Sequence, residues 1–284
     1  MNRSFASLAL LALTGTLHFA GTGCIVGECD NGDDNCTQAT STIEYTGNDA
    51  STSVPYADGQ GIQIETVLGD ITVKTGGSDV KATFSPFTRN KDEAGGQENA
   101  KSELADKLLL EVTAGDPVKI RVAREDGSTN FLGAHVTVTL PTSFSGSFDV
   151  RQGNGVTNVD LGSVSPTSTT ILSDLGDIEC LGATGPLNIQ TDNGDIVVSV
   201  STWAADGTGT ILSGLGDISV SVPADANGSV SLFAPDETVT ATFPSDWPSE
   251  AAAANSVTYT MGDGEGAHLD VTAESLSSIT ATAN

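Results

Sequence analysis

The sequence predicts an all-β protein, a single β-solenoid with a small helix-plus-hairpin insert near its N-terminal end. Gly accounts for 32 of the 284 residues and charged residues for only 17%, a composition typical of β proteins with many turns. The 38% of apolar residues is too high for a chain that stays disordered throughout. The eight residues from Ile171 to Ile178 recur, with one change, from Ile211 to Ile218. A repeat of this kind is typical of solenoids.

Residues 1–23 are predicted to be a lipoprotein-type signal peptide. Arg3 supplies a positive charge, and the segment from Phe5 to Ala20 is almost wholly apolar. This segment is too short, and too interrupted by Gly15, for a comfortable membrane span. The small residues before Cys24 resemble the lipobox of bacterial lipoproteins, in which the Cys thiol is lipidated and becomes the new N-terminus.

The lipobox resemblance has one departure, because Gly21 stands where the pattern usually has an aliphatic residue. Ile25 follows the Cys where Asp could stand, and by resemblance to the usual sorting pattern this favours the outer membrane. We therefore expect an exported protein that is attached to the outer membrane through Cys24 only and faces the periplasm or the cell surface. The alternative is ordinary signal cleavage nearby, which would leave a soluble secreted protein.

Residues 24–55 are expected to form a flexible tether rich in Cys, Asp and Thr. Cys29 and Cys36 bracket an Asp- and Asn-rich loop, which a disulfide could close in an oxidising compartment. The loop lacks the spaced ligands and the terminal Glu of an EF-hand, so we expect no metal there. The stretch from Thr37 to Pro55 has few apolar residues, and we interpret it as a spacer.

The third segment, residues 56–284, is expected to be the solenoid domain, and it includes the insert. Val80 to Phe84 is predicted to be a strand, and Glu98 to Lys107 has helical composition. Two further apolar stretches, 108–113 and 118–122, are predicted to form a hairpin. His135 to Leu140 is predicted to be a strand that ends before a Pro.

The repeat places a Gly-Asp-Ile turn between two short strands. Residues 62–73 align with residues 187–198, and both segments have alternating apolar residues on each side of the turn, as expected for strands with one face inward. Gly would supply the tight corner between the strands. The predicted turn residues are Gly69, Asp70, Gly176, Asp177, Gly194, Asp195, Gly216 and Asp217.

Successive turns are about twenty residues apart, which suits a solenoid coil of two short strands. A shorter copy of the repeat without the Asp surrounds Gly155, and residues 269–280 resemble a degenerate closing copy. We predict that Ile178, Ile196 and Ile218 are buried on the inner face of successive coils. The competing fold is a β-sandwich, which shows similar alternation but has no reason to repeat Gly-Asp-Ile.

The Gly-Asp-Ile repeats, the strand ending at Pro141 and the helix-plus-hairpin insert together resemble the bacterial putative-adhesin domain family. The resemblance covers roughly residues 56–284. It implies a β-solenoid in an exported or membrane-anchored protein of unknown function. The family brings no established catalytic residues that could be transferred to this sequence.

The repeated Asp residues need an explanation, because stacked coils would bring their charges about 4.8 Å apart. One explanation is that each Asp accepts backbone N–H groups within its own corner, as in Asx turns. The other is a calcium ladder formed by Asp177, Asp195 and Asp217. Calcium-binding rolls have a denser Gly and Asp pattern, so we expect no cofactor and keep calcium as the alternative.

The chain is strongly acidic, with 37 Asp and Glu against 11 Lys and Arg. The last basic residue is Arg151, and residues 152–284 contain 17 acidic residues and no Lys or Arg. This balance excludes nucleic acid as a partner, because binding phosphates requires clustered positive charge. The repulsion in the second half must be relieved by solvent, salt or bound cations.

Few residues suited to catalysis remain once the signal peptide is removed. His135 and His268 are the remaining histidines, and both are expected at strand edges or on the surface. The common hydrolase, metalloprotease and phosphate-loop motifs are missing from the sequence. Cys180 alternates with Ile178 in a predicted strand and is expected to be a buried apolar residue.

We therefore expect a non-catalytic binding or scaffolding module of the cell envelope, with a protein or a glycan as its ligand. The alternative is a β-helical carbohydrate-active enzyme, a glycosidase or lyase, that uses carboxylates in a groove.

Overall fold

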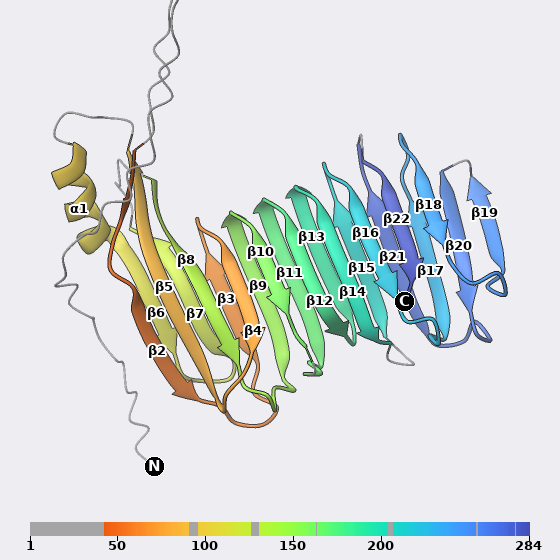
Figure 1. The fold of residues 1–284 in the computed structure, drawn as a ribbon, viewed down its shortest axis with the longest axis horizontal. Coiled ribbons are helices and arrows are strands. Elements are labelled where there is room, and N and C mark those ends of the chain that lie inside the picture. The colour runs from red at the N-terminus through yellow and green to blue at the C-terminus, as the bar shows by residue number, and fades with distance from the viewer. Residues whose placement is uncertain are drawn as a thin grey trace, which may run out of the picture.

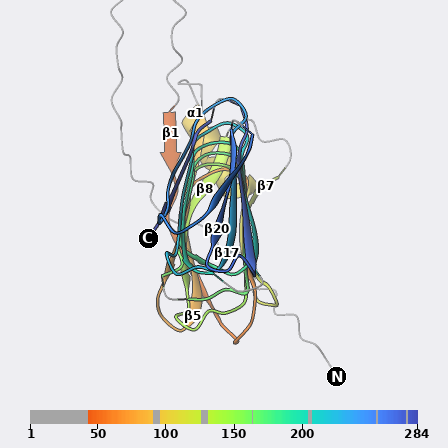
Figure 2. The ribbon, with the colours of Figure 1, turned by 90° about the vertical axis from the view of Figure 1, so that its right-hand side faces the viewer.

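The computed structural model describes residues 43–90, 96–125, 131–162, 164–203, 207–253, 255–275 and 277–284. The signal segment, Cys24, Cys29 and Cys36 lie outside these residues. The described chain forms a rod of two facing sheets whose strands run across its long axis, with one helix at the N-terminal end (Figures 1 and 2). None of the described helical residues form a helix long and apolar enough to cross a membrane.

Each sheet has 11 strands within the described residues. Sheet A follows the order β1 (Ile43–Thr46), β5 (Asp79–Asn90), β8 (Phe131–Leu140), β4 (Ile71–Thr75), β10 (Thr157–Asp160), β12 (Ile178–Thr184), β14 (Ile196–Thr202), β16 (Ile218–Val222), β22 (Ile279–Ala283) and β18 (Val239–Thr242), with β2 (Ala50–Pro55) also paired to β5. Sheet B follows the order β19 (Ser249–Ala253), β20 (Ser256–Met261), β17 (Gly228–Phe233), β21 (Ala267–Ala273), β15 (Thr208–Ser213), β13 (Leu187–Asn193), β11 (Ser168–Leu175), β9 (Ser147–Asn154), β3 (Ile62–Thr66), β7 (Val118–Arg124) and β6 (Leu108–Thr113).

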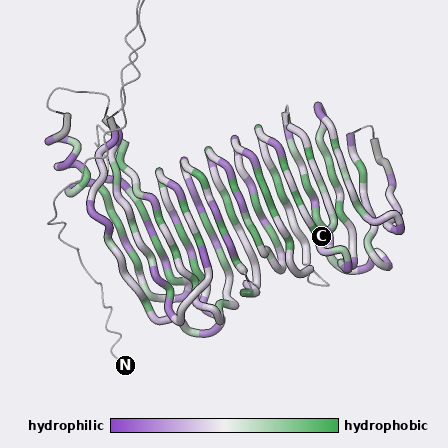
Figure 3. Tube along the Cα trace, in the orientation of Figure 1, coloured by the Kyte–Doolittle hydropathy of each residue, from purple (hydrophilic) through white to green (hydrophobic). Residues whose placement is uncertain are grey.

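The core is built from alternate residues of most of the strands in the two sheets. Figure 3 shows hydrophobic and hydrophilic residues alternating along the strands. Ile178 pairs with Ile196, and Ile196 pairs with Ile218, in parallel register along sheet A. All three side chains are at most 1% exposed, so the prediction that they are buried on successive coils is confirmed. Burying an Ile side chain contributes about 1.5–3 kcal/mol, and the row therefore adds a similar amount at each level of the rod.

We call a strand of sheet B together with the strand of sheet A that follows it a rung. From β9 to β16 four rungs follow one another in chain order, and each pairs in parallel with the next. At both ends of the rod, however, the rungs do not follow one another in chain order, as a single solenoid would require. The rung β3/β4 lies between β7/β8 and β9/β10, although its chain segment precedes both.

The closing copy at the C-terminal end is also out of chain order. The rung β21/β22 pairs with β15 and β16 on one side and with β17 and β18 on the other. The chain thus first forms the more distant rung, turns back through β19 and β20, and then fills the gap. The local apolar pattern of both segments is satisfied by any neighbouring rung, so it could not indicate this order.

The helix-plus-hairpin insert is present at the N-terminal end of the rod. The helix α1 (Gly96–Lys107) buries Ala100 and Leu104, and β6 and β7 form the expected antiparallel hairpin. The prediction of a flexible tether is wrong for residues 43–55, because most of them form β1 and β2, and both strands pair antiparallel with β5. The polar composition of these residues suggested a spacer, but strands at the edge of a sheet can be as polar, because little of their surface lies in the core.

Candidate functional site

The Gly-Asp corners were the candidate site from the sequence, and they form one edge of the rod. Gly176 has φ +130°, a conformation that side chains rarely adopt. A Cβ on Gly176 would lie 2.7 Å from the carbonyl carbon of Gly155 and still closer to its oxygen. Gly194 repeats this arrangement over Gly176. Gly is therefore required by the backbone conformation and by the close stacking of neighbouring corners.

The Asp side chains connect neighbouring rungs. The backbone N–H of Asp195 donates to Oδ1 of Asp177 at 2.9 Å, and the N–H of Asp217 donates to Oδ1 of Asp195 at 2.8 Å. The N–H of Val156 donates in the same way to Asp70 at 2.9 Å. The expectation that each Asp bonds within its own corner is wrong. The amide of the adjacent rung offsets the negative charge of each Asp in this row.

The last carboxylate of the row has the strongest set of donors. Both the backbone N–H and the hydroxyl of Ser278 donate to Oδ1 of Asp217 at 2.8 Å. The backbone N–H and then the hydroxyl of Ser278 lower the pKa of Asp217 below its ordinary value.

The inner side of the corners is also hydrogen-bonded between rungs. The hydroxyl of Thr191 donates to the carbonyl of Gly176 at 3.2 Å, and the hydroxyl of Ser213 donates to that of Gly194 at 3.0 Å. In the part of the chain that the structure describes, no group of three or more His, Cys, Asp or Glu residues could hold a metal ion. The hydrogen bonds that Asp177, Asp195 and Asp217 accept from the next rung make them structural braces of the corner row.

Cys180 lies between the sheets, as expected, and is fully buried as a free thiol. Burial raises its pKa to about 12. A thiol with such a pKa is protonated at neutral pH and is a poor nucleophile, and Cys180 is packed in the core cluster.

The two histidines are half-exposed, as expected. His135 accepts the backbone N–H of Asp70 through Nδ1 at 3.1 Å. The imidazole of His268 joins two side chains, with Nδ1 2.7 Å from the hydroxyl oxygen of Ser229 and Nε2 2.9 Å from Oδ1 of Asp270.

The Ser229–His268–Asp270 chain was missed by sequence reasoning, because Ser229 comes from a different strand and only the β17–β21 register brings it close. These side chains lie on the outer face of sheet B. Both β17 and β21 have strands paired on each side, so their backbone N–H groups are used within the sheet and are not available as an oxyanion hole. A hydrogen-bonded chain without an oxyanion hole is a poor catalyst of acyl transfer.

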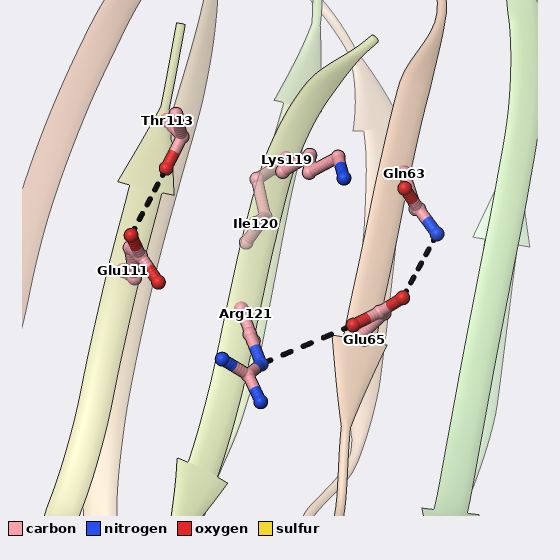
Figure 4. A pocket seen from close by; sticks show the side chains of 7 residues that line it. All are labelled: Gln63, Glu65, Glu111, Thr113, Lys119, Ile120 and Arg121. Atoms are coloured by element: carbon pink, nitrogen blue, oxygen red, sulfur yellow. Dashed lines mark hydrogen bonds and ion pairs between the residues drawn. The ribbon is translucent and has the colours of Figure 1, made fainter.

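The outer face of sheet B has a polar depression near the N-terminal end, with a volume of about 270 Å³ (Figure 4). It is lined by Gln63, Glu65, Glu111, Thr113, Lys119, Ile120 and Arg121. The middle strand β7 provides the cations, and the flanking strands β3 and β6 provide the acceptors. The sequence predicted none of these residues as a site, because the depression depends on the register of three segments that are far apart in the chain.

The register explains the distribution of charge in this polar depression. Lys119 lies opposite Gln63 on one side and Thr113 on the other, and Arg121 lies opposite Glu65 and Glu111. Nε of Arg121 is 4.0 Å from Oε2 of Glu65, and these side chains are 51% and 43% exposed. An exposed pair at this distance is weak, so a ligand can replace it at little cost.

Hydrogen bonds orient the acceptors on both sides of β7. The amide of Gln63 donates to Oε1 of Glu65 at 2.8 Å, and the hydroxyl of Thr113 donates to Oε1 of Glu111 at 3.2 Å. The polar depression therefore presents an ammonium, a guanidinium, two carboxylates, an amide and a hydroxyl on rigid strands. This set suits a polar ligand with both donors and acceptors, such as a glycan or a peptide.

Neither a protein-family model nor a curated protein matches the sequence. Among solved structures, the chain is similar to a putative cell adhesion protein from Clostridium sporogenes, with 12% identity and a TM-score of 0.49 over 84% of this chain and 99% of that chain. It is similar to a putative adhesin from Bacteroides fragilis, with 14% identity and a TM-score of 0.31 over 82% and 97% of the two chains. A third is a putative adhesin from Parabacteroides distasonis, with 10% identity and a TM-score of 0.26 over 83% and 97%. At these low values, the function of this chain has to be argued from its own residues.

Proposed function

We propose that this chain is a non-catalytic, adhesin-like binding module of the cell envelope, carried by a β-solenoid rod with displaced end rungs. Its ligand, a glycan or a protein segment, binds in the polar depression on β3, β7 and β6. The observation that supports this proposal is the arrangement of Lys119 and Arg121 between two rows of acceptors on a rigid, open surface. Hydrogen-bonding groups held in place before binding lose little conformational freedom on binding.

The openness of the polar depression favours binding over catalysis. A glycosidase would need one carboxylic acid with a raised pKa, which burial usually provides. Glu65 and Glu111 flank β7, but Glu65 is 43% exposed and close to Arg121. A panel of glycoside substrates tests this alternative, because turnover that is lost in Glu65→Gln would establish the enzyme.

A glycan array and a panel of envelope proteins test the proposed binding, with Lys119→Met and Arg121→Met as variants. Lys74→Met is the matched control, because Lys74 is exposed on β4 in the opposite sheet. We expect each site variant to weaken binding about tenfold, the loss of one or two charged hydrogen bonds. Equal binding by Lys119→Met, Arg121→Met and Lys74→Met would disprove the proposed site.

We also propose that residues 1–23 are removed as a signal peptide, that Cys24 is lipidated in the outer membrane, and that Cys29 and Cys36 form a disulfide in the remaining tether. Cys24→Ser should then release the protein from membranes into the soluble fraction of lysed cells. Unchanged membrane retention of this variant would contradict the lipid anchor.

A further inference from the structure

The two sheets end at different levels at the C-terminal end of the rod. Sheet A ends with β18, whereas sheet B continues past β17 through β20 and β19 (Figure 1). The strands β17 and β18 pair with β21 and β22, which form one rung. Within the described residues, the overhanging β20 and β19 therefore have no strand of sheet A opposite them. We call the edge of β18 and the overhanging inner face of β20 the β18 step.

Apolar side chains continue into this step. On β18, Val239 and Ala241 are only partly buried, whereas their partners Ile279 and Ala281 on β22 are 0% exposed. On β20, Val257 and Tyr259 are likewise partly buried and continue the rows of Leu232 and Val230.

An aromatic cluster covers part of the step. The Phe243 ring centroid is 5.0 Å from that of Trp247 and 4.7 Å from that of Tyr259. Phe243 and Tyr259 nevertheless stay only partly buried. The inner row of the last rung is thus covered less completely than the same row one level deeper.

Among the described residues, the backbone of β18 is paired on one side only, with β22. The N–H of Ile279 donates to the carbonyl of Thr238 at 3.1 Å, and Val239 lies opposite Ile279. Along a strand of a parallel pair, the backbone N–H and carbonyl groups of successive residues point to opposite sides. The backbone groups of Thr240 and Thr242 therefore point to β22, as that of Thr238 does. The N–H and carbonyl groups of Val239 and Ala241 then point to the open edge, where another strand can pair with them.

The charge around the step selects the partner. Asp236 and Glu237 precede β18, Asp246 follows it, and Glu250 lies on β19, and all four residues are exposed. Residues 152–284 contain no Lys or Arg to balance them. A second copy of this end would bring acid against acid, whereas a cationic segment would be attracted.

We propose that the β18 step binds an extended, cationic segment of a partner protein, which adds a strand to β18. The backbone of the segment would bond to Val239 and Ala241, and alternate apolar side chains would cover Val257 and Tyr259. Its Lys or Arg residues would lie beside the acidic residues that flank β18. This site is separate from the polar depression at the other end of the rod, so either can fail without the other.

The test uses a fluorescent peptide with the sequence Lys-Val-Thr-Val-Thr-Val-Lys, blocked at both ends, in a fluorescence polarisation assay with the whole protein. We expect saturable binding that weakens as salt is added. The peptide with Glu in place of both Lys residues should not bind. Equal binding of the two peptides, or no binding of the Lys peptide, would overturn the proposal.

Ala241→Pro removes an outward N–H from β18, and Pro is tolerated at an edge of a sheet. We expect this variant to bind the peptide about tenfold more weakly or worse. Lys74→Met is the control and should bind it like the wild type, because Lys74 is exposed on β4, several strands away from β18 in sheet A. Unchanged binding by a folded Ala241→Pro variant would refute strand addition.

A second measurement does not depend on the folding of any variant. The same Lys peptide, N-methylated on its Val and Thr residues, keeps its charge but cannot donate to a strand edge. We expect the wild-type protein not to bind this N-methylated peptide. Binding as tight as that of the unmethylated Lys peptide would overturn the proposal.

Discussion

Replacing Gly176 with Ala tests whether stacked corners hold the rod together. The new Cβ would lie 2.7 Å from the carbonyl carbon of Gly155, closer than real Cβ contacts, and Ala would also have to adopt φ +130°. The conformational strain costs about 1–3 kcal/mol, and crowding against the backbone costs about 1–3 kcal/mol more. We therefore expect Gly176→Ala to lower the free energy of unfolding by about 2–6 kcal/mol.

Gly77→Ala is the control for Gly176→Ala. Gly77 has φ +79°, and a Cβ there would have no atom within 4 Å, so only the conformational strain of about 1–2 kcal/mol remains. Urea unfolding followed by circular dichroism gives both values. Equal destabilisation by the two substitutions would refute the claim that corner stacking excludes a side chain at Gly176.

Three further predictions concern the core, the corner row and the acidic half. Ile196→Asp places a carboxylate in the inner row, where it cannot be solvated, and should cost about 4 kcal/mol or more, seen as loss of the folded far-UV spectrum. The pKa of Asp217 is lowered in the folded state. Its contribution to the free energy of unfolding is therefore fully present above the unfolded pKa of about 4 and is lost as the pH falls through the folded pKa. Asp217→Asn should therefore destabilise at pH 7, and the difference should shrink in acid. Sodium and calcium chloride at matched ionic strength should raise the melting temperature equally, because the carboxylates are screened. A larger calcium effect that disappears in Asp195→Asn would contradict this.

The sequence was sufficient to predict which residues face inward and where the chain turns. The inner positions of Ile178, Ile196 and Ile218 follow from an alternation that is local to each strand. The hairpin of β6 and β7 was also predictable, because its two strands are adjacent in the chain.

What could not be predicted depends on neighbours that are distant in sequence. The placement of β3/β4 and β21/β22 requires knowing which rung lies beside which, and every rung offers a similar apolar row. The bond from Asp195 to Asp177 joins two rungs rather than one corner. The polar depression needs the register of β3, β6 and β7 together.

The late position of β21 and β22 in the chain affects how the protein can be made. During synthesis, β17 and β18 emerge before the strands that connect them to the rest of the rod. Folding therefore cannot proceed from one end to the other as the chain leaves the ribosome, and the last step joins segments that are far apart in sequence, which is slow. Nascent chains stalled after β20 should consequently be digested by protease from β17 onward, whereas β9 to β16 should already resist it.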